Sequence, residues 1–216
     1  MVLMAYEDVK NHLLSISDRE KRALFCLIYA GMAREGEIVR ARYGHNKPLE
    51  ADDIENFDNR LEITIRSEKS KRVKKVDRFG RLLEKTRTIS VAPAERVVPI
   101  YKNRESWLTD IIEDWCNFKI TGALFNYSTR WVEYQFRKWF PDIVSNRGLD
   151  KDGSSHTVHW LRGWRYTHYR RGEVTGKIVD SKIVSMLGGW VSSAVPEKCY
   201  DFTKIKDFYG ELENVF

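Results

Sequence analysis

The chain has 216 residues, 42% of them hydrophobic, and its 37 Lys and Arg outnumber 31 Asp and Glu to give a formal net charge of +6. This length suits one main domain with a sizeable core, or two small ones. No apolar run approaches the roughly 18 residues that a membrane span needs, and the N-terminus MVLMAYEDVK lacks the basic start and apolar centre of a signal peptide. The sequence therefore argues against a membrane-spanning or secreted protein.

The cysteines favour a reducing compartment. There are three, Cys26, Cys116 and Cys199, which are widely spaced and form no Cys-x-x-Cys pair. This number and spacing suggest neither a disulfide framework nor a zinc knuckle. We expect a cytoplasmic protein, either nucleoid-associated or in the cytoplasm of a host cell.

The basic excess is concentrated in two stretches. Residues 66–87 read RSEKSKRVKKVDRFGRLLEKTR and residues 162–171 read RGWRYTHYRR, while acidic clusters at 50–58 and 110–114 cancel part of the total. Clustered Lys and Arg favour a polyanionic partner such as DNA. A lysine-rich strand edge that resists aggregation is the alternative interpretation of the first stretch.

The N-terminal quarter predicts helices. Apolar residues recur at helical spacing over 6–16 and again over 19–32, where the segment around Asp18 offers an N-cap. The centre of the second helix, ALFCLIYA, is expected to be buried. A short third helix containing Glu37 is expected after Gly31, followed by a loop over 44–58.

Alternating patterns follow. LEITI at 61–65, LLEKTRTISV at 82–91 and RVVPIY at 96–101 predict three strands, with turns at Phe79-Gly80 and Ala92-Pro93. They are expected to form one small antiparallel sheet.

The remainder predicts helices again. Residues 104–118 and 128–140 carry aromatic stripes, and Pro141 ends the second of these helices. A polar loop is expected over 145–155, and further helices near 156–171, 176–187, 192–200 and 204–214. Four tryptophans at helical spacing are expected in the core: Trp107, Trp115, Trp131 and Trp139. The fold class predicted is α+β, mainly α-helical with a small antiparallel β-sheet.

Residues 156–172, HTVHWLRGWRYTHYRRG, combine histidines, arginines and aromatics in one amphipathic run. By itself this is an ordinary phosphate-binding helix, and a metal site at His156 and His159 lacks a third ligand at suitable spacing. Cleavage of a DNA phosphodiester needs cations on the non-bridging oxygens, a nucleophile, and groups that move protons. Arginine suits the first task because its planar fork grips phosphate bidentately.

Two stretches supply such arginines and resemble boxes of the tyrosine recombinase (phage integrase) family. AGMAREGEIVRAR at 30–42 resembles the box TGxRxxEL, with Arg34 and Glu37 at the matching positions. HWLRGWRYTHYRRG at 159–172 resembles the box HxLRHTxAT, which gives His159 and Arg162.

A third stretch resembles the family's last box. In LGGWVSSAVPEKCYDF at 187–202, Trp190 precedes Tyr200, which matches the nucleophilic tyrosine. Tyr209 is the fallback. All three boxes occur in family order, and ERVVPIY resembles a strand of the family's sheet.

The resemblance implies a metal-free and cofactor-free site. Arg34 and Arg162 would clamp the scissile phosphate, His159 would accept or relay the proton of Tyr200, and Trp190 would donate its indole N–H or support the site. Glu37 would orient Arg34. The two arginines would also favour the phenolate form of a tyrosine that ordinarily titrates near ~10.

The catalytic lysine would lie in the sheet. Counting back from ERVVPI, Lys85-Thr86 resembles the family's Lys-Thr pair, so Lys85 is the expected acid for the leaving 5′-oxygen. Lys69 and Lys71 remain alternatives. DNA contacts are expected from the basic hairpin and the 156–172 helix, at Lys69, Lys71, Arg72, Lys74, Lys75, Arg165, Arg170 and Arg171.

The implied protein is a site-specific recombinase or integrase that acts on double-stranded DNA. It would work as a homo-multimer, such as a tetramer. Its setting would be DNA recombination or DNA integration, for example the integration of a virus, plasmid or other mobile genetic element. Residues 1–216 would be its catalytic domain, without the family's N-terminal core-binding domain, and residues 203–216 would form a helix that packs in cis or docks in trans. A type IB topoisomerase and a catalytically silent DNA-binding protein with the same fold are the alternatives.

Overall fold

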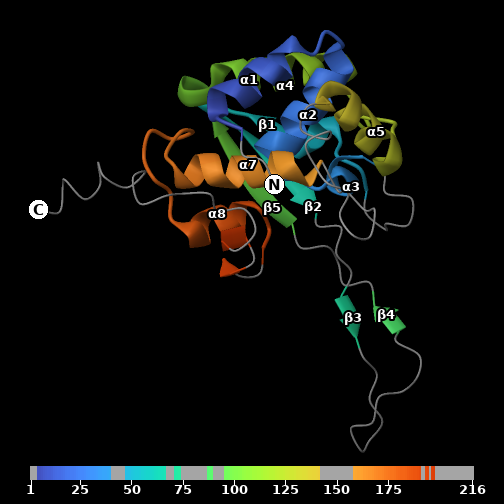
Figure 1. The fold of residues 1–216 in the computed structure, drawn as a ribbon. Coiled ribbons are helices and arrows are strands. Elements are labelled where there is room, and N and C mark those ends of the chain that lie inside the picture. Colours follow the sequence, from blue (N-terminus) through green and yellow to red (C-terminus); the bar gives the residue numbers. More distant parts are fainter. Residues whose placement is uncertain are drawn as a thin grey trace, which may run out of the picture.

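The computed structural model describes residues 4–39, 47–66, 71–73, 87–89, 95–141, 158–190, 193–194 and 196–197. Its elements in chain order are α1 (Tyr6–Ser15), α2 (Arg19–Ala30), α3 (Glu35–Ile38), η1 (Ala51–Asp53), β1 (Ile54–Asn56), β2 (Arg60–Arg66), β3 (Lys71–Val73), β4 (Arg87–Ile89), β5 (Glu95–Tyr101), α4 (Lys102–Lys119), α5 (Thr129–Trp139), α7 (His159–Arg170) and α8 (Ser181–Leu187). The mainly helical α+β class is confirmed (Figure 1).

Helix α2 lies at the centre of the fold. Asp18 caps it by accepting a hydrogen bond from the backbone N–H of Lys21 at 3.1 Å. Its residues 23–30 are all buried, as ALFCLIYA predicts, and α4 and α7 both pack against it. Trp115 is buried in the same core, and Trp107, Trp131 and Trp139 pack against it, so the predicted core tryptophans are confirmed.

The main sheet has the strand order β1-β2-β5 and is antiparallel throughout. In β2 the alternation buries Leu61, Ile63 and Ile65, and Ile63 pairs with Val98 of β5. Strand β1 lies within the acidic segment that was expected to be a loop. That expectation was wrong because a short edge strand carries only a weak apolar pattern: one half-buried isoleucine and two exposed polar residues.

The expectation that the three predicted strands form one sheet was also wrong. β2 pairs directly with β5, whereas β3 and β4 form a separate two-stranded ladder with Arg72 opposite Thr88. Within the described residues, only Arg87–Ile89 of the predicted strand over 82–91 is a strand. Figure 1 shows this ladder below the body of the domain. Long-range pairing decided the order, and alternation within a strand does not specify its partner.

Helix α7 is an interior helix. Residues 160–169 are all buried, between α2 and α8 (Figure 1). The expected DNA-facing position of this helix is not seen for Arg162 and Arg165, because aromatic packing and internal ion pairs enclose both side chains. Of the helix predicted near 176–187 only Ser181–Leu187 forms, after a turn in which Gly172 and Gly176 have positive φ angles. The helix expected near 204–214 lies outside the described residues.

Among the described residues, no helix is both long enough and apolar enough to cross a membrane.

Candidate functional site

The site is built around the carboxylate of Glu37. Residues 35–38 form one short helical turn in which Arg34 is the N-cap and Glu37 reaches back to it. The backbone N–H of Arg34 donates to Glu37 Oε2 at 2.9 Å, and Arg34 Nη1 donates to Oε1 at 3.1 Å. The Glu37 side chain is fully buried, whereas that of Arg34 is 16% exposed. Glu37 thus contacts both the backbone and the side chain of Arg34.

A second arginine grips the same carboxylate. Arg96 of β5 places Nη2 at 2.7 Å from Glu37 Oε2 and Nη1 at 3.4 Å from Oε1. Sequence reasoning missed Arg96. The available signal was the period of the strand, because Arg96 shares its face with the buried Val98 and Ile100, and a cation on a core face needs a partner.

Arg162 of α7 is the third arginine, with only 1% of its side chain exposed. Its Nη1 donates to the carbonyl oxygen of Met32 at 2.8 Å and lies 3.8 Å from Glu37 Oε2. Its Nη2 donates to the carbonyl oxygen of Gly188 at 2.6 Å. The guanidinium therefore joins the turn before α3 to the end of α8.

Trp190 covers Arg162. The guanidinium carbon of Arg162 lies 3.9 Å from the centroid of the Trp190 ring, and Tyr166 meets the ring edge-on at 5.7 Å between centroids. The turn after α8 allows this approach because a Cβ at Gly188 would collide with the Trp190 ring. The backbone N–H of Trp190 donates to the Ser185 carbonyl at 2.9 Å, and this hydrogen bond fixes the position of the backbone that carries the ring.

His159 begins α7 beside the same turn. Its Nδ1 lies 3.5 Å from Oε2 of Glu35, the residue that follows Arg34, and 28% of its side chain is exposed. His159 is one helical turn before Arg162, so the two share a face of α7. Glu35 was not anticipated as its neighbour.

The charges of the cluster favour an anion. Burial by itself raises the pKa of Glu37, but the charge and hydrogen bonds of Arg96, the charge of Arg162 and the backbone N–H of Arg34 outweigh it, so this pKa lies below its ordinary value. Glu37 is therefore ionised at neutral pH. Three guanidinium groups around Glu37, even with the carboxylate of Glu35 counted, leave a formal surplus of one positive charge.

Arg165, expected to contact DNA, is instead turned into the protein interior. Its side chain is fully buried, and its Nη atoms bind both carboxylate oxygens of Glu105, at 2.5 and 2.6 Å. Tyr6 donates a hydrogen bond to the same carboxylate at 3.1 Å, and Tyr169 accepts one from Arg165 at 3.1 Å. Arg165 holds α7 to the start of α4, which is a structural role.

The other two arginines of α7 and its C-cap also make local contacts. Arg170 Nη1 donates to the Val179 carbonyl at 2.7 Å, and Arg171 Nη1 lies 3.8 Å from Glu173 Oε1. The structure describes only the backbone of Lys71 and Arg72, on β3. Five further predicted residues lie outside the described residues: Lys69, Lys74, Lys75, Lys85 and Tyr200.

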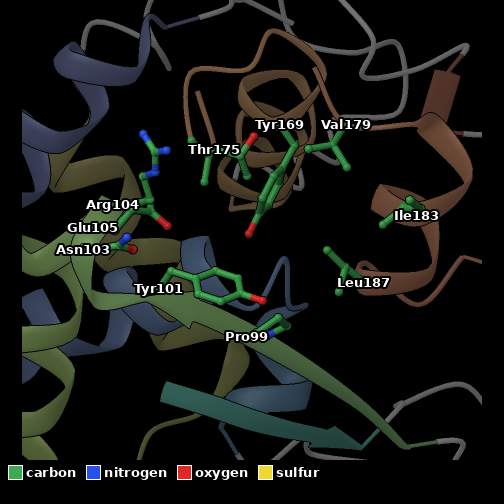
Figure 2. A pocket seen from close by; sticks show the side chains of 11 residues that line it. Pro99, Tyr101, Asn103, Arg104, Glu105, Tyr169, Thr175, Val179, Ile183 and Leu187 are labelled. Atoms are coloured by element: carbon green, nitrogen blue, oxygen red, sulfur yellow. The ribbon is translucent and has the colours of Figure 1, made fainter. Parts of the chain in front are cut away.

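A hollow of about 420 Å³ is lined by none of the three arginines of the cluster (Figure 2). Its walls are mostly apolar and come from β5, α4, α8 and the segment after α7, with Pro99, Ile183 and Leu187 among them. In Figure 2 the ring of Tyr169 points from α7 toward Tyr101. A duplex binds along a surface, so this hollow is not the phosphate-binding candidate.

Among the described residues, no group of three or more His, Cys, Asp or Glu side chains is arranged to hold a metal ion.

The fold is that of the catalytic domain of tyrosine recombinases. The chain is similar to the XerH site-specific recombinase bound to difH substrate in a pre-cleavage complex, with a TM-score of 0.55 and 13% identity over 100% of this chain and 54% of that one. It is similar to XerH bound to palindromic difH substrate in a post-cleavage complex, with a TM-score of 0.56 and 13% identity over 99% of this chain and 52% of that one.

The chain thus spans about half the length of these structural neighbours. No family model matches the sequence, and no curated protein matches it.

Proposed function

We propose that this chain is the catalytic domain of a site-specific DNA recombinase that cleaves and rejoins DNA strands through a 3′-phosphotyrosyl intermediate. The observation that carries the proposal is the convergence of the three sequence boxes. Arg34 precedes α3, Arg162 lies in α7 and Trp190 follows α8, yet all three contact Glu37 or one another. The XerH neighbours, which share the fold, are site-specific recombinases bound to their substrates.

The geometry suits a phosphodiester. Arg34 has the most exposed side chain of the three arginines, and Arg162 is held by two carbonyl oxygens and Trp190. A preorganised cluster with surplus positive charge stabilises the extra negative charge of a pentacoordinate phosphate more than that of the ground state. The described part of the site therefore favours charge stabilisation, with His159 at its edge to exchange a proton.

In the proposed reaction the hydroxyl oxygen of Tyr200 attacks the phosphorus and the bond to the 5′-oxygen breaks. His159 accepts or relays the tyrosine proton, and Lys85 protonates the leaving oxygen. A 5′-hydroxyl from the partner strand then attacks the phosphotyrosine, which restores a phosphodiester and frees Tyr200. Each step exchanges one phosphoester bond for another, so no nucleotide is consumed.

Three finer features belong to the same proposal. The GGW spelling before Tyr200 resembles the ending of Cre recombinase. The partners are double-stranded DNA and further copies of this chain, assembled as a multimer such as a tetramer. The biological setting is integration or excision of a mobile element, or dimer resolution, inside a cell.

The test uses suicide DNA substrates, nicked near candidate sites and pooled over sequence, followed by denaturing gels and peptide mapping. A DNA adduct on Tyr200 is expected, and Tyr200→Phe should abolish it while Tyr209→Phe, the matched control, leaves it. An adduct on another residue would move the nucleophile. Binding without any adduct would favour a silent DNA-binding protein, and relaxation of supercoiled plasmid without strand exchange would favour topoisomerase chemistry.

A further inference from the structure

Arg96 is the one guanidinium of the cluster that none of the three sequence boxes contains. It comes from β5, where the two-residue period turns its side chain to the core face, and 9% of that side chain is exposed. A buried cation is costly unless paired and hydrogen-bonded, and Glu37 provides the pairing. The question is what this arginine contributes to the site.

The first contact is with the carboxylate that orients Arg34. Arg96 places one Nη near each oxygen of Glu37, at 2.7 and 3.4 Å. Arg162 lies 3.8 Å from the same carboxylate, beyond hydrogen-bond distance. Without Arg96 the buried carboxylate of Glu37 would lose two hydrogen-bond donors. Arg162 would then move closer to it, or Arg34 would form a second side-chain hydrogen bond with it. Either change would move a guanidinium of the proposed phosphate site out of its present position.

The second contact is with the turn that carries Trp190. Gly189 has a φ of +70°, and a Cβ built there would lie 3.0 to 3.2 Å from Nη1, Cδ and Cζ of Arg96. The arginine side chain therefore lies directly against this turn. It borders two of the elements that present predicted site residues, α3 with Glu37 and the turn after α8 with Trp190.

We propose that Arg96 is a positioning residue of this site: it binds the Glu37 carboxylate so that Arg34 and Arg162 keep their present positions around it, and it fixes the Gly188-Gly189 turn behind Trp190. The inference rests on the proposed function for its catalytic consequence. Its structural part, the coupling of Arg96 to Glu37, can be tested without DNA.

The charged groups that face Glu37 are Arg34 at the start of α3, Arg96 on β5 and Arg162 on α7. Burial by itself raises the pKa of Glu37, and among these three groups Arg96 lowers it most. Removal of the Arg96 charge should therefore raise this pKa, and Lys at the same position should largely keep it low.

The experiment compares Arg96→Gln and Arg96→Lys with Arg66→Gln. Arg66 is a matched control because it lies on the neighbouring strand, opposite Glu95, and also forms a two-pronged pair with a buried carboxylate, that of Asp53. The measurements are the single-turnover rate of adduct formation, DNA affinity, thermal denaturation, and the pKa of the Glu37 carboxyl by carbon NMR, assigned with Glu37→Gln.

We expect R96Q to slow adduct formation by about 10- to 100-fold while DNA affinity changes much less, because outer partners of a site typically contribute on this scale. R96K should recover part of the lost rate, and R66Q should form the adduct at the wild-type rate. R96Q in an E37Q background should add little to the effect of E37Q alone, because Arg96 acts through Glu37.

A wild-type rate for R96Q would overturn the proposal, and so would equal losses for R96Q and R66Q, since both would then reflect stability alone. An unchanged Glu37 pKa in folded R96Q would overturn the coupling whether or not the protein cleaves DNA. If the wild-type chain forms no adduct, the proposed function fails, and the NMR comparison still judges Arg96.

Discussion

The guanidinium of Arg162 lies over the ring of Trp190, with its central carbon 3.9 Å from the ring centroid. The two residues are 28 positions apart in the sequence. A hydrogen bond of 2.6 Å from Arg162 Nη2 to the Gly188 carbonyl joins the same two segments. A cation stacked in this way keeps its hydrogen-bonding edge for in-plane acceptors, which here are the carbonyl oxygens of Met32 and Gly188. The pair is the firmest link between the second and third sequence boxes.

Replacement of Trp190 by Ala should therefore slow adduct formation on suicide DNA by about 10- to 100-fold. Trp190→Phe, which keeps a ring beneath Arg162 but lacks the indole N–H, should lose less. Trp131→Phe on α5, where the indole stacks on Tyr127, makes the same chemical change away from the cluster. An undiminished rate in the Ala variant would show that the stack does not matter for the reaction.

Gly188 should be sensitive for a steric reason. Its φ of −78° is ordinary for any residue, but an added methyl group would collide with the Trp190 ring. Gly188→Ala should displace Trp190 and lower the unfolding free energy by about 1–3 kcal/mol. Chemical denaturation measures this loss, and indole fluorescence reports the displacement.

Gly122→Ala is the contrasting control. Gly122 has a φ of +76° and no atom within 4 Å of its added Cβ, so it reports backbone strain without a collision. If Gly188→Ala were harmless to stability and to the Trp190 signal, the close approach of ring and turn would not exist in solution.

The buried ion pair of Arg165 and Glu105 should stabilise the fold without contributing to DNA affinity. Loss of one partner leaves an uncompensated buried charge, so Arg165→Leu should lower the unfolding free energy by about 3–5 kcal/mol. Asp114→Asn breaks the exposed pair with Arg19 and should cost less than about 1 kcal/mol. Urea denaturation checks both values.

The salt dependence of DNA binding provides the functional half of that test. Each phosphate contact that is lost reduces the slope of log affinity against log salt. Arg165→Leu should leave this slope unchanged under conditions where the variant is folded. A shallower slope would restore Arg165 as a DNA contact.

His168 should make stability depend on pH. Its Nε2 faces the Met4 carbonyl at 2.8 Å and its Nδ1 faces the Tyr29 hydroxyl at 2.7 Å. Burial, opposed by the Met4 hydrogen bond and aided by the charges of Arg165 and Arg171, lowers the pKa of His168 from 6.5 to about 4. The ring is therefore neutral in the fold, with Glu173 as its nearest carboxylate.

The unfolded chain binds a proton at His168 below about pH 6.5, whereas the folded chain does so only near pH 4. The stabilising contribution is complete above about pH 6.5 and is lost as the pH falls toward 4, by about 2 kcal/mol at pH 5. His168→Gln should remove this part of the pH dependence in denaturation curves recorded between about pH 7.5 and 5. Parallel curves for the two proteins would contradict the assignment.

Local pattern was sufficient for much of the fold. The apolar period placed the buried centre of α2, the alternation placed β2 and β5, and Pro141 ended α5 as expected. These features depend on residues a few positions apart, and their physical causes, amphipathic burial and the chemistry of proline, act over the same range.

The sequence also determined which residue types are available to the site. The three boxes identified candidate residues from pattern alone, namely Arg34, Glu37, His159, Arg162 and Trp190. Only the tertiary structure decided that β2 pairs with β5, that Arg165 turns inward to Glu105, and that Arg96 shares the carboxylate of Glu37. The reason is that ion pairs and strand pairing join segments far apart in the chain. A charged residue reads the same in sequence whether it meets solvent, DNA or a buried carboxylate, and its partner is fixed only when the core closes around it.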